Sequence, residues 1–116
     1  MSIRRIGAGA RMSKAVVHGN TVYLAGQVAD KTKGASVADQ TQEIVGIIDE
    51  LLAEAGSDKT KILSATIYLS DIATFPQMNA VWDTWVVQGH TPARATVEAK
   101  LAAPEYTVEI AVIAAI

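Results

Sequence analysis

The sequence has no cysteine, few aromatic residues and no long apolar run. Without cysteine, disulfides, thiolate metal sites and cysteine nucleophiles are excluded. No uninterrupted apolar stretch approaches the ~18 residues that a membrane-spanning helix needs, and no apolar segment follows the two arginines near the N-terminus. We therefore expect a cytoplasmic protein without a membrane partner.

The charge is nearly balanced. Ten basic and twelve acidic residues give a formal net charge of -2, and the basic residues are scattered along the chain. This pattern lacks the electrostatic footprint of a nucleic-acid-binding protein, so we expect no nucleic-acid partner. Half of the residues are hydrophobic, which is typical of a globular protein, and the 116 residues suit one domain spanning residues 1–116.

The residue pattern predicts an α/β (α+β) fold with elements in the order β-β-α-β-α-β-β. Gly19-Asn20 suits a tight hairpin turn, Ser36 suits a helix N-cap, and Pro92 forces an extended chain before Arg94. A short extra strand at the N-terminus is compatible with this order. The expected elements are strands at 14–18 and 21–28, a helix at 36–55, a strand within 61–71, a helix from 71 or 74 to 88, and two strands on either side of a turn at Pro104-Glu105.

The last strand indicates that one copy of the chain is not enough. Two amphipathic helices can cover only one face of a single sheet. Alternation in the last strand sends Val108, Ile110, Val112 and Ala114 toward the helices, and Thr107, Glu109, Ala111 and Ile113 toward the other face. Because the second set is half apolar, we expect another copy of the chain to cover it, which gives a homo-oligomer.

Arg94 and Glu109 are charged residues placed within the mostly apolar terminal strands. Alternation separates Arg94 and Thr96 from Ala95 and Val97, and we assign the apolar pair to the helix side. Arg94 is then expected on the same face as Glu109. The pair is either a structural ion pair at a subunit boundary or a site in which Arg94 holds a ligand carboxylate while Glu109 orients water or moves a proton. Spacing does not choose between them.

Three segments together resemble the Rid (YjgF) family of reactive-intermediate deaminases. The segment "PARATVEAKLAAPEYTVEI" is similar to the family signature, with its Arg and Glu separated by 109 − 94 = 15 positions. The segments "NTVYLAGQVA" and "FPQMNAVWDTWV" resemble the family's early strand and its Met-Asn helix, and "WDTWVVQGHTPAR" is most similar to the YoaB-like branch. The resemblance covers nearly the whole chain.

The resemblance implies a trimeric barrel of chorismate-mutase-like fold, with two helices on one face of each sheet and three clefts between subunits. It also implies hydrolysis of small imines or enamines such as 2-iminopropionate to 2-keto acid and ammonia, without a metal or organic cofactor. Arg94 would hold the substrate carboxylate and Glu109 would position the attacking water. The other implied substrate-binding residues are Asn79, Thr96, Gly26 and Ala25.

Two positions depart from the family pattern. Met12 stands before Ser13 where members have Tyr, and Ala25 stands before Gly26 where they have Ser. Both changes remove a hydroxyl from the expected pocket. The alternative function is therefore a non-catalytic trimeric protein that binds small carboxylates or a protein partner. A nuclease role, sometimes attributed to relatives, fits poorly with the acidic balance.

Three further side chains lie close to these motifs in the sequence. His90 precedes "TPAR" and is near enough to reach a cleft, although a contact with the end of the preceding helix is the commoner role of such a histidine. Trp82 and Trp85 lie three positions apart on one helix, where they are expected in the core or in a subunit contact. Of the two, Trp85 could form part of the wall of the cleft between subunits.

Overall fold

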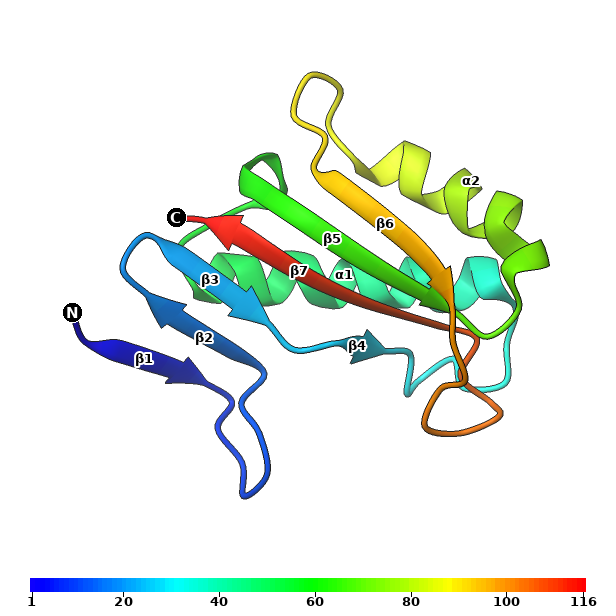
Figure 1. Ribbon diagram of the computed structural model, residues 1–116, viewed down its shortest axis with the longest axis horizontal. Coiled ribbons are helices and arrows are strands. Elements are labelled where there is room, and N and C mark those ends of the chain that lie inside the picture. The colour runs from blue at the N-terminus through cyan, green and yellow to red at the C-terminus, as the bar shows by residue number, and fades with distance from the viewer.

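The computed structural model describes residues 1–116, which form one mixed sheet and two α-helices (Figure 1). The strands are ordered β1-β2-β3-β7-β5-β6, and β4 also pairs with β7. All neighbouring strands are antiparallel except β5 and β6, which are parallel. The elements are β1 (Ile3–Ile6), β2 (Ala15–His18), β3 (Thr21–Leu24), β4 (Gln27–Val28), α1 (Val37–Glu54), β5 (Ile62–Leu69), α2 (Phe75–Trp85), β6 (Ala93–Glu98) and β7 (Val108–Ala115), with 3-10 turns at Lys59–Lys61 and Ile72–Thr74.

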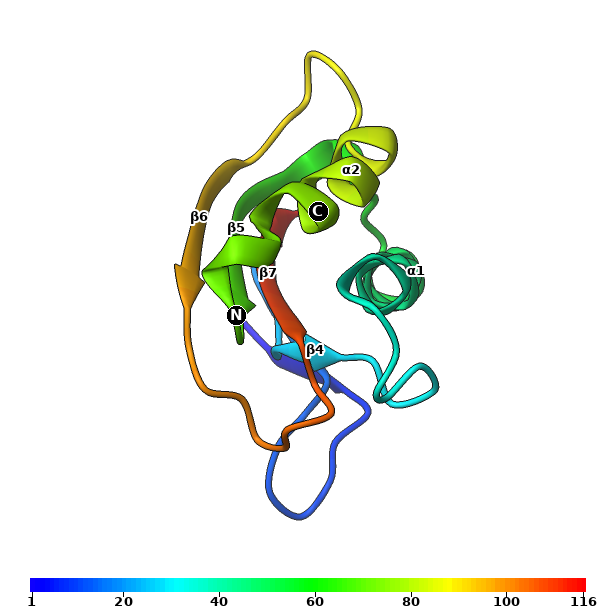
Figure 2. The same ribbon diagram turned by 90° about the vertical axis from the view of Figure 1, so that its right-hand side faces the viewer.

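Both helices lie on the same side of the sheet, as Figure 2 shows. The hydrophobic core fills the space between them and the central strands, and it contains 23 buried residues. Val108, Ile110, Val112 and Ala114 of β7 all belong to this core, which confirms the helix-facing side predicted for the last strand.

The predicted start of α1 is confirmed, and the predicted end of α2 is wrong. Ser36 caps α1 by accepting a hydrogen bond from the backbone N–H of Asp39. The second helix was expected to reach residue 88, but it ends at Trp85 because Val86 takes an extended backbone conformation. Two consecutive β-branched residues, Val86 and Val87, favour extended backbone at this point.

The hairpin between β2 and β3 turns at Gly19-Asn20, as expected. Gly19 has a φ of 62° and Asn20 does not have a positive φ, which is the pattern of a type II′ turn. The N-terminal residues form the extra strand β1. The strand expected at 21–28 is divided in two, because Ala25 and Gly26 lie between β3 and β4.

The face of the sheet opposite the helices, called the open face below, carries exposed apolar side chains. Tyr23, Val97 and Ile113 are 46%, 44% and 36% exposed. They lie on β3, β6 and β7, so they are spread across the sheet. Neither helix is long and apolar enough to cross a lipid bilayer.

Candidate functional site

Arg94 lies on β6, the outer strand, and its guanidinium is held by α2. Its Nη1 atom donates a hydrogen bond of 2.9 Å to Asn79 Oδ1. The guanidinium carbon lies 5.5 Å from the ring centre of Phe75 and 5.3 Å from that of Trp82, within the range of cation–π attraction. Residues 75, 79 and 82 are three and four positions apart, so they share one face of the helix. One helix face therefore orients the arginine.

The strand register places Arg94 on the helix side of the sheet. Arg94 pairs with Ala65 and Thr96 pairs with Ile67, and both partners on β5 are buried under the helices. Val97, expected on the helix side, is instead exposed on the open face. The expectation that Arg94 shares a face with Glu109 is thus wrong. Its premise was that apolar residues mark the buried side, which does not hold on an edge strand exposed on both faces.

Glu109 lies on the open face of β7, between β4 and β5. It pairs with Val28 on one side and with Tyr68 on the other. Its carboxyl group lies against Gly26, because a Cβ built on Gly26 would be 2.9 Å from Glu109 Cδ. Since Arg94 and Glu109 lie on opposite faces of the sheet, they do not meet within one chain.

The other predicted site residues divide between these two places. Asn79 and Thr96 lie with Arg94, and the Thr96 hydroxyl is buried without a hydrogen-bond partner. Ala25 adjoins Gly26, and its carbonyl oxygen accepts a hydrogen bond of 2.8 Å from Gln27 Nε2. The structure therefore separates the predicted set into an Arg94 cluster (Arg94, Asn79, Thr96) and a Glu109 cluster (Glu109, Gly26, Ala25).

Met12 lines a hollow of about 550 Å³ together with Gly26. The hollow lies between β4, α1 and the loop that joins β1 to β2, and four carboxylates and two lysines are among its lining residues. Met12 is one of the two positions that depart from the family pattern. Met12 and Gly26 thus line the same hollow, and Glu109 is not among its lining residues.

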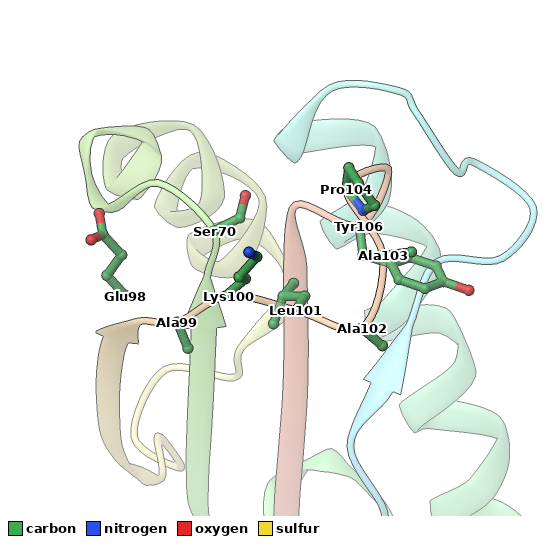
Figure 3. Close-up of a pocket in the computed structure, with 9 residues that line it drawn as sticks. All are labelled: Ser70, Glu98, Ala99, Lys100, Leu101, Ala102, Ala103, Pro104 and Tyr106. Carbon is green, nitrogen blue, oxygen red and sulfur yellow. The ribbon is translucent and has the colours of Figure 1, made fainter.

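A second hollow, of about 460 Å³, lies at the loop between β6 and β7 (Figure 3). Leu101 lies near its centre, and Ser70 and Lys100 contribute polar groups. Tyr106 donates a hydrogen bond to Asp30, which raises the pKa of the Tyr106 hydroxyl. None of the predicted site residues lines this hollow.

A family model described as endoribonuclease L-PSP matches residues 2–116. The chain belongs to this family, also called YjgF or Rid. A RutC family protein of Haemophilus influenzae is 48% identical over 98% of both chains, and the RutC family protein YoaB of Escherichia coli is 46% identical over the full length of both. The crystal structure of a YjgF family member from Neisseria meningitidis has a TM-score of 0.96 and 46% identity, covering 99% of this chain and 95% of that one.

A more distant relative carries a name that includes an activity. The rat protein named 2-iminobutanoate/2-iminopropanoate deaminase is 32% identical over 107 residues, covering 88% of this chain and 77% of that one. The Rid-family fold is thus shared closely with proteins named only by family, and more distantly with one named for imine deamination.

Sequence reasoning missed two residues that support the clusters in this Rid-family chain. Phe75 provides one of the two rings against Arg94. Gln40, fully buried on α1, donates to the carbonyl oxygens of Ala35 and Glu105 and accepts a hydrogen bond of 2.9 Å from the backbone N–H of Thr107. It therefore anchors the segment that leads into Glu109. A glutamine on the apolar face of the predicted helix was the available signal.

The two tryptophans have separate roles. Trp82 stacks on Arg94, whereas Trp85 Nε1 donates a hydrogen bond of 3.0 Å to Asp49 on α1. Both tryptophans belong to the buried core, which confirms their expected place there, and that Trp85 also walls a cleft between subunits stays a prediction. His90 lies exposed in the turn after α2, with its backbone N–H donating to the carbonyl of Val87.

Proposed function

We propose that the protein hydrolyses small 2-imino acids to 2-keto acids and ammonia. The observation that carries this proposal is the oriented guanidinium of Arg94. One of its N–H groups donates to Asn79, and the ring faces of Phe75 and Trp82 pack against it. The other N–H groups of the planar fork remain for a ligand, and a carboxylate matches their geometry.

In this reaction, water adds across the C=N bond of the imine and the C–N bond then breaks, releasing ammonia. Glu109 takes a proton from the attacking water and passes it to the imine nitrogen, and when the C–N bond breaks the hydroxyl proton of the adduct goes by the same carboxylate to the departing nitrogen as the C=O bond forms. Imines hydrolyse in water unaided, so holding the substrate and placing the water account for the catalysis. A metal or organic cofactor is not needed for this chemistry.

The site requires two copies of the chain. Arg94 faces the helix side and Glu109 faces the open side of the same sheet, so one copy supplies Arg94 and another supplies Glu109. The exposed apolar residues Tyr23, Val97 and Ile113 on the open face favour coverage by a second copy. We propose the trimeric barrel implied by the resemblance, with the sites in clefts between subunits.

The name of the rat relative supports the chemical class. That protein is named as a deaminase of 2-iminobutanoate and 2-iminopropanoate, and both molecules carry a carboxylate beside the imine. Because this chain places an arginine with free donors at an exposed position, an imino acid of this size suits the Arg94 cluster.

A second candidate function is the binding of small carboxylates without turnover. The specific observation in its favour is the side chain of Met12, which lines the larger hollow together with Gly26 but offers no hydroxyl. Ala25, the other departing position, likewise supplies only its backbone. In this alternative Arg94 has the same role and Glu109 has no chemical role.

The nuclease activity in the description of the family model is less well supported by this chain. Ten basic residues against twelve acidic ones do not favour the binding of a polyanion, whereas one oriented arginine is enough for a small anion.

The test generates 2-iminopropionate in solution from alanine and an amino-acid oxidase and traps the remaining imine with semicarbazide. Wild type is expected to accelerate the loss of imine, and Arg94→Ala is expected to lower kcat/KM by about 100-fold or more, since a misplaced substrate loses most of the benefit of orientation. Arg4→Ala is the matched control. Arg4 also lies on an outer strand and reaches a helix, through a 3.4 Å hydrogen bond to the Glu54 carbonyl.

Equal imine decay with wild type, with Arg94→Ala and without protein, across several amino-acid precursors, would contradict the deaminase proposal. Binding of pyruvate by wild type but not by Arg94→Ala, measured by calorimetry, would then support the carboxylate-binding alternative.

A further inference from the structure

The passage from β3 to β4 contains one extra residue. From Tyr23 to Gln27 the chain advances four positions, while the partner strand β7 advances three, from Ile113 to Ile110. This count defines a β-bulge, a feature that re-aims side chains and occurs often beside active sites. Leu24 and Ala29 are both buried although they are an odd number of positions apart, as a bulge between them requires.

Gly26 lies in this bulge, directly against the carboxyl group of Glu109. A Cβ built on Gly26 would lie 2.9 Å from Glu109 Cδ and 3.2 Å from Cγ, and closer still to Oε2. Side chains do not tolerate such distances without moving. The volume that a side chain at position 26 would occupy is therefore the volume that the carboxylate occupies.

The backbone itself does not require glycine here. The φ angle of Gly26 lies outside the left-handed region, in contrast to Gly7, Gly19, Gly34, Gly56 and Gly89. An alanine could adopt this backbone conformation. The absence of a side chain is thus explained by the room that Glu109 needs.

We propose that Gly26 is a positioning residue for Glu109. Because Gly26 has no side chain, the Glu109 carboxylate can lie directly against the backbone at this position. The catalytic consequence rests on the proposed function, in which Glu109 handles the proton of the attacking water. The Gln27 Nε2 atom donates a hydrogen bond to the Ala25 carbonyl across Gly26, and this bond stabilises the backbone of the bulge next to the carboxylate. The resemblance placed Gly26 among the substrate-binding residues, and the contact gives it a different role.

A side chain at position 26 should disturb catalysis without lowering stability. The atoms that a new Cβ would meet belong to the flexible side chain of Glu109, so the carboxylate can swing away while the backbone stays in place. Gly26→Ala should therefore fold and assemble like wild type while its carboxylate is displaced. Gly46→Ala is the matched control, since Gly46 lies exposed on α1 and a Cβ there would meet nothing within 4 Å.

The experiment records the side-chain carboxyl resonance of Glu109 in protein labelled with ¹³C at glutamate, assigned by its disappearance in Glu109→Gln. Gly26→Ala is expected to shift this resonance, and Gly46→Ala is expected to leave it unchanged. In the imine assay, Gly26→Ala should lower kcat by about tenfold with little change in KM, because the group that places the water is displaced by less than the width of a side chain. In the Glu109→Gln background, the same substitution should cause no further loss.

An unshifted Glu109 resonance in Gly26→Ala would overturn the inference. So would equal losses of kcat when Gly26→Ala is introduced into wild type and into the Glu109→Gln variant, because Gly26 would then act independently of the carboxylate. If wild type shows no imine hydrolysis, the proposed function fails, and the resonance alone decides whether Gly26 positions Glu109.

Discussion

The two charged groups of the candidate site are held in opposite ways. Arg94 is held by attraction, through a hydrogen bond to Asn79 and the ring faces of Phe75 and Trp82, all on α2. Glu109 is positioned by packing, because its carboxyl group lies directly against Gly26 in a bulged stretch of backbone. The orientation of the arginine therefore depends on side chains of one helix, and that of the glutamate depends on the path of the chain.

In the proposed reaction, each copy of the protein would therefore contribute two half-sites, one with Arg94 and one with Glu109. The Arg94 cluster is formed between β6 and α2, and the Glu109 cluster is formed between β4, β5 and β7. Each cluster is formed by residues of a single chain. Substitutions in α2 should thus affect anchoring of the substrate, and substitutions around the bulge and the following loop should affect proton transfer.

The largest expected effect concerns Gln40, which supports the Glu109 side only. Gln40→Leu leaves the backbone N–H of Thr107 and the carbonyl oxygen of Ala35 without their partner in a part-buried place, while the Glu105 carbonyl keeps only its hydrogen bond from the Gly34 N–H. The free energy of unfolding, measured in urea, should fall by about 2–3 kcal/mol. Gln42→Leu, an exposed position on the same helix, is the control and should change it little. Equal effects of the two substitutions would contradict the anchoring role of Gln40.

Much of the fold could be predicted from the residue pattern, because the central elements have one buried and one open side. Alternation in β7 identified its core face, and the Ser36 cap located the start of α1. The face of Arg94 could not be predicted in this way. On an outer strand, Ala93, Ala95 and Val97 are exposed although they are apolar, so polarity does not reveal which side faces the helices.

The role of Gly26 could not be predicted from the sequence either. It depends on a register in which four positions of one strand face three of another, and no local pattern in "LAGQVA" specifies that count. The resemblance identified the residue as important, and the contact with Glu109 supplied a physical reason. The separation of Arg94 from Glu109 similarly required the pairing of β6 with β5.

A smaller effect is expected from Asn79, which supports the Arg94 side only. Asn79→Ala removes the acceptor for Arg94 Nη1 and leaves both aromatic rings in place. Because the guanidinium then loses one of three constraints, KM for the imino acid should rise by about tenfold, equivalent to one hydrogen bond to a charged group. Gln77→Ala, an exposed position on the same helix, is the control. A fall in kcat at unchanged KM would show that Asn79 acts on the chemical step rather than on anchoring.

The smallest expected effect is a pH dependence of the free energy of unfolding, which arises from a loop on the Glu109 side. Glu43 on α1 accepts hydrogen bonds from the backbone N–H groups of Lys31 and Thr32 and from the Thr32 hydroxyl, so it fixes the loop after β4. Partial burial raises the pKa of the Glu43 carboxyl, but these hydrogen bonds outweigh it and leave the pKa below its ordinary value of 4.5. A carboxyl whose pKa is lowered by folding stabilises the fold above its unfolded pKa, and this contribution is lost as the pH falls through the folded value.

Glu43→Gln should therefore lower the free energy of unfolding by about 0.5–1 kcal/mol at neutral pH, a modest amount because the group is partly exposed. The difference between wild type and variant should shrink as the pH is lowered below 4.5. Urea unfolding at a series of pH values measures it, and Glu50→Gln, an exposed glutamate on the same helix, is the control. A difference that stays constant down to about pH 3 would show that the carboxylate charge of Glu43 does not hold the loop. The loop beside the Glu109 cluster would then owe its position to Gln40 and the bulge alone.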